Sequence, residues 1–289
     1  MWRFVIRGLC FSLLPALPVL SNAKEISDFS ANPDLPSEVV ASGFEFLTPE
    51  SQALQLDDFA NPGFLWVDRG RLLFEKQEGK RACVDCHSER DSEMDSEMDS
   101  RREGKTDPES DGKVLPGSAT RFPKINQDTN QLINLEGQIN HCRVERQSLS
   151  PLPYESEQLL SLTAYVTSLS RNMAYDIAID GTADAYYDRG RAYFFKRKGQ
   201  LNLACSQCHD DNWGKLLRGD RISQGHPNAY PGYRLEWQNF GSLHRRFRDC
   251  DVGVKAEPFA AGSETYLALE LYLKWRAKRL LIESPGIRR

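Results

Sequence analysis

Two short motifs in this sequence repeat the same arrangement of two cysteines and a histidine, residue types that can bind a metal or a prosthetic group. Both read Cys-x-x-Cys-His, and they comprise Cys83, Cys86 and His87 in one case and Cys205, Cys208 and His209 in the other. Two thiols three positions apart on a helical turn can form thioethers with the two haem vinyl groups, and the following histidine then serves as proximal iron ligand. A pair of zinc sites is the alternative, but neither motif has the second Cys-x-x-Cys pair that would complete one. The sequence therefore predicts two covalently bound c-type haems.

The sixth ligand of each iron must come from elsewhere in the chain, and methionine or histidine is usual. No methionine follows Met173, and Met94 and Met98 lie in a low-complexity stretch. The remaining candidates are His141, Cys142 and Met173 for the first iron and His226, His244 and Cys250 for the second. Only the cysteines occupy matching places after both motifs, so we predict that Cys142 and Cys250 ligate the irons opposite His87 and His209. A disulfide between the two cysteines is the alternative in an oxidising compartment.

The residues before Cys250 add a second kind of chemistry. Arg245, Arg246 and Arg248 place three guanidinium groups near this thiol in sequence. Nearby cations favour the thiolate, and arginine binds small oxyanions through its forked donors. The alternative is that these arginines pair with haem propionates. We expect at least one of them to be left for an anionic substrate.

These groups must be positioned by an internal repeat. Asp68-Arg69-Gly70-Arg71 precedes the first motif and Asp188-Arg189-Gly190-Arg191 precedes the second. A segment with helical spacing follows each single cysteine, around residues 157–166 and 264–273. Glycine and proline between motif and cysteine predict loops without regular strands. We therefore predict a mainly α fold of two tandem cytochrome c-type domains related by internal duplication, each binding one covalent haem.

The predicted domain boundaries follow from this repeat. Residues 1–23 have the basic start, apolar run and small-residue cleavage site of a secretory signal peptide. We expect an N-terminal arm at 24–60, a first cytochrome c-like domain at 61–175 and a second one, which contains Cys250, at 176–289. An acidic low-complexity loop is predicted at 91–112. Export to the periplasm is expected, with no membrane span after signal cleavage, because the apolar run is too short to cross a bilayer comfortably.

Composition excludes several classes of protein. The 289 residues are 40% hydrophobic and 27% charged, with a formal net charge of −4. These values argue against wholesale disorder and against a multi-span membrane protein. No strongly basic face is indicated, so nucleic acid is not expected as a partner.

From about Phe59 to Arg276 the chain resembles the SoxA family, the cytochrome subunit of the sulfur-oxidising SoxAX complex. The most specific part is the run from Arg246 to Cys250, followed by Lys255-Ala256-Glu257-Pro258-Phe259, where Lys255 replaces the usual arginine of the family. The two haem motifs resemble the dihaem form. The resemblance implies that Cys250 is the catalytic residue, carried as a persulfide, as well as the sixth ligand of the second haem. It also implies that Arg246 binds substrate and that Cys142 is the distal ligand of the first haem.

The resemblance further implies an activity and partners. The chain is expected to be an L-cysteine S-thiosulfotransferase that oxidatively conjugates thiosulfate to a cysteine of a sulfur-carrier protein (SoxY of SoxYZ), passing two electrons to c-type haem. A SoxX-like monohaem cytochrome c would form a heterodimer with it, and a further cytochrome would accept the electrons. The alternatives are a non-enzymatic dihaem periplasmic electron-transfer cytochrome and a dihaem peroxidase. Both leave residues 245–250 unexplained.

Overall fold

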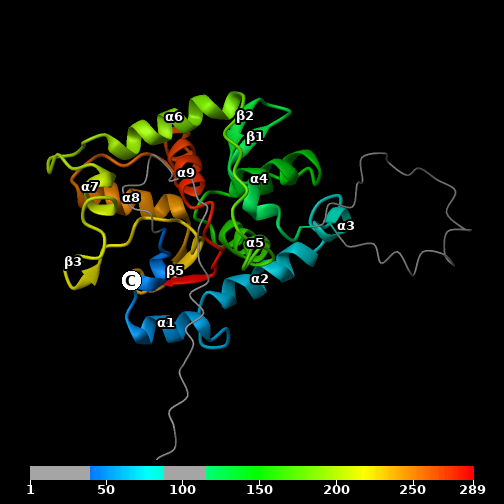
Figure 1. The fold of residues 1–289 in the computed structure, drawn as a ribbon. Coiled ribbons are helices and arrows are strands. Elements are labelled where there is room, and N and C mark those ends of the chain that lie inside the picture. Colours follow the sequence, from blue (N-terminus) through cyan, green and yellow to red (C-terminus); the bar gives the residue numbers. More distant parts are fainter. Residues whose placement is uncertain (1–39, 88–114) are drawn as a thin grey trace, which may run out of the picture. The chain divides into compact units, whose positions relative to one another are not determined.

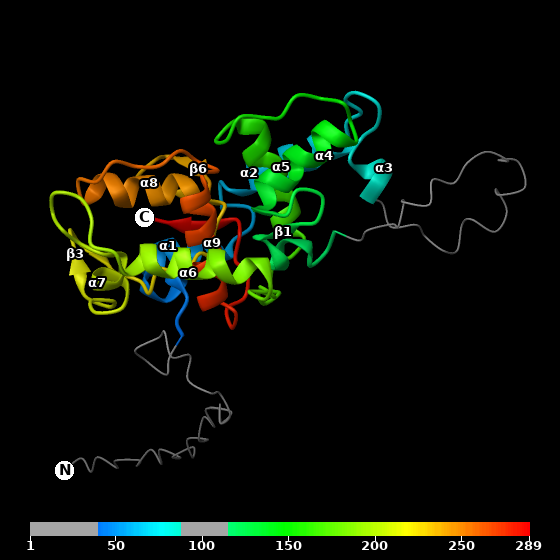
Figure 2. The same ribbon diagram turned by 90° about the horizontal axis from the view of Figure 1, so that it is seen from above.

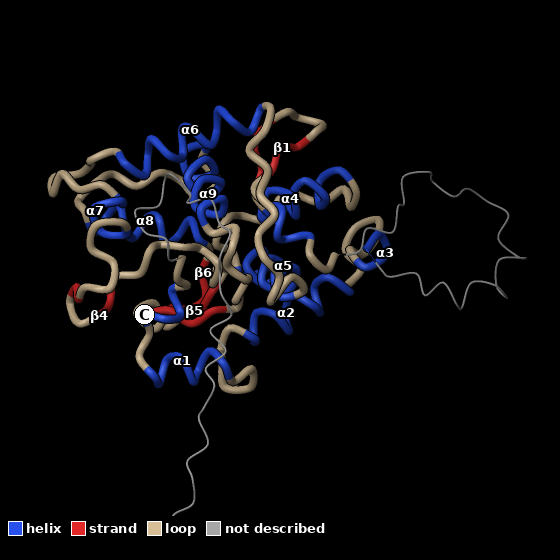
Figure 3. Tube along the Cα trace, in the orientation of Figure 1, coloured by secondary structure: helices blue, strands red, loops and turns tan. Residues whose placement is uncertain are grey.

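The computed structural model describes residues 40–87 and 115–289, and helices make up most of its regular structure (Figure 3). The N-terminal arm contains η1 (Gly43–Phe46) and α1 (Pro49–Leu56), and the first repeat contains α2 (Phe64–Glu75), α3 (Val84–His87), η3 (Ser118–Arg121), β1 (Lys124–Asn126), β2 (Gln131–Ile133), α4 (Leu135–Glu145) and α5 (Glu157–Ser168). The second contains α6 (Thr182–Phe195), α7 (Cys205–His209), β3 (Leu216–Leu217), β4 (Asp220–Arg221), β5 (Gly232–Arg234), β6 (Asn239–Gly241), α8 (Leu243–Gly253), α9 (Glu264–Arg276) and β7 (Gly286–Arg288). The prediction of a mainly α chain is confirmed. The predicted signal peptide and the acidic loop at 91–112 lie outside the described residues.

Each repeat is built on a close crossing of two helices, α2 with α5 and α6 with α9 (Figure 1). A Cβ atom at Gly70 would lie 1.9 Å from the backbone oxygen of Ser161, and one at Gly190 would lie 2.0 Å from that of Ala268. No side chain fits at such distances, so glycine is what allows the helices to approach backbone to backbone. The repeated Asp-Arg-Gly-Arg segments are therefore repeated packing sites.

Ion pairs and helix caps repeat in the same way. Across the two crossings Arg69 pairs with Glu157 and Arg189 pairs with Glu264. The side chain of Ser156 caps α5, and that of Ser263 caps α9. Each cap satisfies a backbone N–H group that the first turn of a helix leaves unpaired.

A short antiparallel hairpin precedes the helix that carries each single cysteine. Strands β1 and β2 pair with Ile125 opposite Leu132, and β5 and β6 pair with Tyr233 opposite Phe240. In the second repeat β7 adds in parallel to β5, which gives a three-stranded sheet of order β6-β5-β7. The prediction of loops without strands is therefore wrong at these places. A hairpin is favoured because it pairs backbone groups that the adjoining hydrophobic core removes from water.

The two hairpins are exchanged between the hydrophobic cores of the repeats. Leu132 of β2 lies in the core formed around α6 and α9, with Phe194 and Leu269. Phe240 of β6 lies in the core formed around α2 and α5, and its ring stacks on Trp66 at a centroid distance of 5.2 Å. The predicted boundary at residue 175 thus separates two sequence repeats, and each repeat completes the core of the other.

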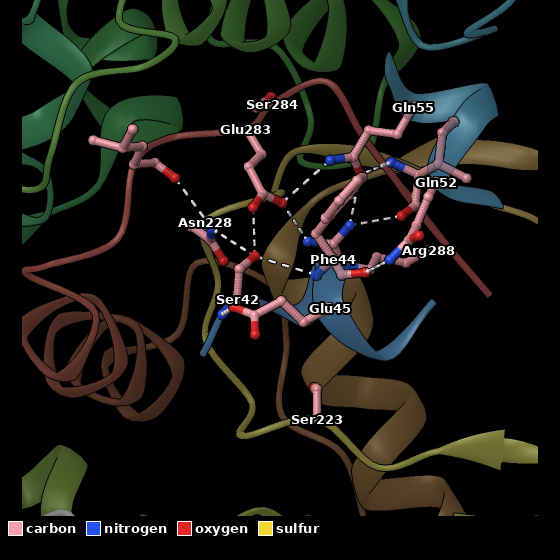
Figure 4. Close-up of polar contacts among 12 residues, drawn as sticks. Ser42, Phe44, Glu45, Gln52, Gln55, Ser223, Asn228, Glu283, Ser284 and Arg288 are labelled. Carbon is pink, nitrogen blue, oxygen red and sulfur yellow. Dashed lines mark hydrogen bonds and ion pairs between the residues drawn. The ribbon is translucent and has the colours of Figure 1, made fainter. Parts of the chain in front are cut away.

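The described part of the predicted N-terminal arm is fastened to the C-terminal residues (Figure 4). Ser42 accepts a hydrogen bond from Asn228 at 3.1 Å and donates one to Glu283. Gln55 of α1 accepts from Arg288 Nη1 at 2.7 Å, and Arg288 Nη2 also lies 2.7 Å from Glu283. This segment therefore supports the second repeat although it precedes the first in sequence.

The two haem-motif helices, α3 and α7, lie on opposite sides of the crossed helix pairs in both views (Figures 1 and 2). Within residues 40–87 and 115–289, no helix combines the length and the apolar character that crossing a membrane requires.

Candidate active site

The second Cys-x-x-Cys-His motif forms the short helix α7, on which Cys205 and Cys208 lie one turn apart and His209 is the last residue. His209 Nδ1 donates a hydrogen bond to the backbone oxygen of Ser223 at 2.7 Å. This bond fixes the imidazole ring and leaves Nε2 as the nitrogen that can ligate a metal. Gly225 has φ +75°, and a Cβ there would lie 2.9 Å from the His209 ring. Glycine therefore allows the loop to pass close against the imidazole.

Helix α8 brings Cys250 to this motif. The helix begins after Ser242, whose side chain accepts a hydrogen bond from the backbone of Arg245 at 3.2 Å. Burial raises the pKa of Cys205 to about 11, and the nearby Cys250 sulfur contributes to the rise. Burial and Cys250 also raise the pKa of Cys208. Cys250 is therefore within electrostatic reach of both motif cysteines, as expected of a distal ligand.

The first motif has the same arrangement. Cys86 and His87 lie in α3, Cys83 immediately precedes it, and Cys142 lies on α4. Burial raises the pKa of Cys83, and the neighbouring Cys142 adds to the rise while a hydrogen bond from Gln147 at 3.5 Å opposes it. The six cysteines from Cys83 to Cys250 are all free. The alternative disulfide between Cys142 and Cys250 is therefore not formed.

A turn before each motif fixes its distance from the single cysteine. A Cβ at Gly79 would lie 2.3 Å from the backbone oxygen of Gln147, and one at Gly199 would lie 2.1 Å from that of Val254. Both glycines have positive φ, +66° and +67°. Each turn thus packs backbone to backbone on the segment that follows the cysteine-bearing helix. Glycine is required at these positions both for the left-handed conformation and for the close approach.

The donors in each repeat fit a covalent c-type haem: two thiols and an imidazole from one helical turn, and a third thiol from another helix. Buried donors near the second set also fit a bound polar group. Arg276 donates Nη2 to Asp210 at 2.6 Å, next to His209, but its buried Nε and Nη1 have no hydrogen-bond partner among the described residues. Buried polar groups are normally paired, so a polar part of a bound group would complete this region.

The other candidate axial ligands are engaged elsewhere. Each of the three histidines has a ring nitrogen in contact with an oxygen of another side chain. The distances are 3.0 Å from His244 to Glu270, 3.1 Å from His226 to Gln224 and 3.1 Å from His141 to Asp128. Burial lowers the pKa of His226 to about 3. Met173 is 40% exposed. These contacts support the choice of the two cysteines.

The three arginines before Cys250 have three different roles. Arg246 lies one turn before Cys250 on α8, and the thiol is the largest of the influences that raise the pKa of Arg246. The guanidinium of Arg245 lies 4.3 Å from the ring centroid of Trp237. Arg248 donates to the backbone oxygen of Phe259 at 2.6 Å. Arg245 and Arg248 are thus committed to protein contacts, and Arg246 is the arginine that faces the thiol.

Comparison with known proteins points to one family. Residues 106–175 match the family model described as SoxA/TsdA, cytochrome c domain. The chain is 34% identical over 251 residues to the L-cysteine S-thiosulfotransferase subunit SoxA of Rhodovulum sulfidophilum, covering 86% of this chain and 80% of that protein. It is 33% identical to the protein of the same name from Pseudaminobacter salicylatoxidans, covering 88% and 82%.

The fold agrees as well. The crystal structure of SoxXA from P. pantotrophus matches with a TM-score of 0.75 and 32% sequence identity, covering 86% of this chain and 87% of that one. The chain belongs to the SoxA family. The predicted resemblance is confirmed, and so is a mainly helical cytochrome c-type fold. The matching cytochrome c domain also supports covalently bound c-type haem.

One residue of this SoxA site was not found by sequence reasoning. Asp251, which follows Cys250, is only 1% exposed. Its Oδ2 accepts hydrogen bonds from Tyr193 at 2.8 Å and Tyr266 at 2.7 Å, and its Oδ1 lies 2.5 Å from Lys198 Nζ. Asp251 therefore fastens the Cys250 turn of α8 to α6 and α9. A lone aspartate beside a cysteine has no recognisable pattern, because its partners are distant in sequence.

Proposed function

We propose that this chain is a dihaem cytochrome that performs its thiosulfate chemistry at Cys250. Membership of the SoxA family confirms the predicted enzyme class, an L-cysteine S-thiosulfotransferase subunit with a cytochrome c domain. The observation that carries the finer proposal is the shared face of α8. There Arg246 and Cys250 lie one turn apart, beside Cys205 and Cys208.

Two haems are assigned to the two repeats. Cys83 and Cys86 would hold the first covalently, and His87 and Cys142 would be its iron ligands. In the second repeat the same roles fall to Cys205 and Cys208, and to His209 and Cys250. When bound, the haems supply an acceptor for the two electrons that the reaction releases.

The residues of α8 account for substrate binding and sulfur transfer. Arg246 holds the sulfonate oxygens of thiosulfate by charge-assisted hydrogen bonds, which leaves the outer sulfur facing the Cys250 sulfur. The Cys250 thiolate and this outer sulfur form an S–S bond as two electrons are removed. A carrier-protein thiolate then attacks the outer sulfur, leaves with the thiosulfonate group and restores the Cys250 thiolate. If Cys250 is a persulfide, the same bonds form and break at its terminal sulfur.

The partners follow from this reaction and from the structural relative. A SoxYZ-like carrier would supply the acceptor cysteine, and a further cytochrome would remove the electrons. A SoxX-like monohaem cytochrome is proposed as the heterodimer partner, because the matching crystal structure is of a SoxXA complex. With a signal peptide at residues 1–23, the site of action is the periplasm.

The proposal is tested by Arg246→Ala. This variant should keep both haem spectra and lose thiosulfate transfer by about tenfold to a hundredfold, the value of a charge-assisted hydrogen bond. Arg171→Ala is the matched control, because Arg171 is an arginine paired with a carboxylate, Asp58 at 2.7 Å, in the first repeat. Full turnover in Arg246→Ala would show that another residue binds the substrate.

The mass of the Cys250 peptide, taken from protein purified without reductant, gives a second test. A thiol or one additional sulfur is expected. A peptide crosslinked to Cys142 would remove both proposed ligands and contradict the mechanism.

A further inference from the structure

A second buried arginine lies beside the Arg246 site and is not fully paired. Arg234, at the end of β5, is 5% exposed. Its Nη1 donates to the hydroxyl of Tyr230 at 3.3 Å and its Nη2 lies 2.7 Å from Glu236 Oε2. Its Nε is buried and has no hydrogen-bond partner among the residues described. A buried guanidinium with an unused N–H can donate a further hydrogen bond to the oxygen of a ligand.

Arg234 and Arg246 face the same two groups. Tyr230 and Glu236, the contacts of Arg234, are also among the groups that interact electrostatically with Arg246, together with Cys250 and Asp249. Trp237 joins the two elements, because its ring centroid lies 5.2 Å from the Arg234 guanidinium and its Nε1 donates a hydrogen bond at 2.6 Å to Asp249, the residue before Cys250. Two guanidinium groups, from β5 and α8, thus lie near one hydroxyl and one carboxylate beside the turn that carries the thiol. The pKa of Glu236 is lowered, first by the hydrogen bond from Arg234 and further by the charges of Arg234, Arg246 and Arg289.

Glu236 differs from the two arginines in its exposure. Its side chain is 56% exposed, whereas that of Arg234 is 6% exposed. The carboxylate therefore reaches from the surface to a buried cation, and it can turn back into water without disturbing the core. A carboxylate bound in this way occupies the place that an oxyanion would take on the guanidinium.

We propose that Arg234 is a second oxyanion-binding residue of the thiosulfate site and that Glu236 occupies it until the substrate's sulfonate oxygens take its place. This inference rests on the proposed function, in which Arg246 binds the sulfonate beside Cys250. Two guanidinium groups match the double negative charge of thiosulfate, and the displaced carboxylate disfavours anions too weakly charged to compete with it. Arg234 and Glu236 are thereby determinants of substrate specificity, and neither takes part in sulfur transfer itself.

The experiment is steady-state thiosulfate transfer by the haem-loaded protein to a carrier-protein cysteine, with sulfate as a competing dianion. Glu236→Gln should lower KM for thiosulfate about two- to fivefold with kcat unchanged, and should strengthen inhibition by sulfate. Arg234→Met should raise KM about 10- to 100-fold, again with kcat nearly unchanged, because binding is lost equally from ground state and transition state. Arg234→Lys should recover part of this loss. Arg171→Met is the control and should change neither constant.

The double variant separates displacement from a general effect of charge. If Glu236 acts at Arg234, Glu236→Gln should no longer lower KM once Arg234 is methionine. Equal effects in both backgrounds would overturn the proposal, and so would an unchanged KM in Glu236→Gln. Because Glu236 is exposed, the effect of Glu236→Gln on KM in the parent protein remains readable even where Arg234→Met folds poorly. If Arg246→Ala loses transfer as expected but the Arg234 and Glu236 variants leave KM unchanged, this inference fails while the proposed function stands. If Arg246→Ala is fully active, the proposed function fails first.

Discussion

In the first repeat, Glu78 of the turn before the haem motif pairs with Arg143, the residue after Cys142, at 3.4 Å. In the second repeat, Lys198 at the matching position pairs with Asp251, the residue after Cys250, at 2.5 Å. The same contact is thus made with the charges exchanged. The duplication has kept the geometry that holds a single cysteine against its motif, because that geometry is set by backbone packing at Gly79 and Gly199.

The two pairs differ in what surrounds them. The carboxylate of Glu78 is 32% exposed, whereas that of Asp251 is 1% exposed and also accepts hydrogen bonds from two tyrosine hydroxyls. An ion pair with a partly exposed carboxylate contributes little to stability, whereas breaking a buried and fully hydrogen-bonded ion pair is strongly destabilising. The difference indicates that Cys250 is held more rigidly than Cys142, as preorganised chemistry requires.

The largest expected effect concerns the two cysteines themselves. Cys250→Ser should reduce thiosulfate transfer at least about 10³-fold, because it removes the reacting sulfur. Cys142→Ser should leave transfer within about tenfold of the parent, because in the proposed mechanism Cys142 forms no bond to substrate. Both are measured as transfer rates at equal haem content. Equal losses in the two variants would mean that the repeats share the chemistry.

The next effect concerns the exchanged ion pair. Asp251→Asn should lower the free energy of unfolding by about 3–5 kcal/mol, since it leaves the Lys198 charge buried without its partner. Arg143→Gln should change it by about 0–1 kcal/mol. Denaturant unfolding of the haem-loaded proteins measures both. Similar values for the two variants would remove the proposed difference in rigidity.

The smallest effect arises where the repeats meet. Glu136 of α4 and His244 of α8 occupy matching positions, and Glu270, Lys274 and Tyr154 also face Glu136. A cavity of about 20 Å³ in this interface, lined by Glu136, Glu270 and Lys274, is large enough for about one water molecule. Burial, with the nearby Glu270 charge, raises the pKa of Glu136 to about 7. Lys274 and His244 outweigh burial at Glu270 and lower its pKa.

The raised pKa of Glu136 determines how its contribution to the stability of the fold changes with pH. The folded state holds this proton more tightly than the unfolded chain, so the stability it contributes is complete below about pH 4.5 and is lost as pH rises through about 7. Between pH 5 and pH 8, the free energy of unfolding of Glu136→Gln should therefore rise by about 1–3 kcal/mol relative to that of the parent. Thermal unfolding at the two pH values checks this. A constant difference between the proteins would show that Glu136 is ionised throughout.

Much of the site could be predicted from the sequence because its signals are local. A Cys-x-x-Cys-His motif places three haem-binding groups on one helical turn, whatever the rest of the chain does. The spacing of Arg246 and Cys250 places both on one face of a helix in the same way. The repeat then indicated Cys142 and Cys250, since symmetry relates positions without any knowledge of contacts.

The tertiary structure decided what depends on distant partners. The exchange of Leu132 and Phe240 between the two cores, the attachment of residues 40–56 to the C-terminal segment and the burial of Asp251 all join parts of the chain that are far apart in sequence. In the sequence, nothing distinguishes the three closely spaced arginines Arg245, Arg246 and Arg248. Only the packing around α8 gives them different roles. Local spacing fixes which groups share a turn. Which groups leave water together is fixed only when the two repeats pack, because burial is a property of the assembled core.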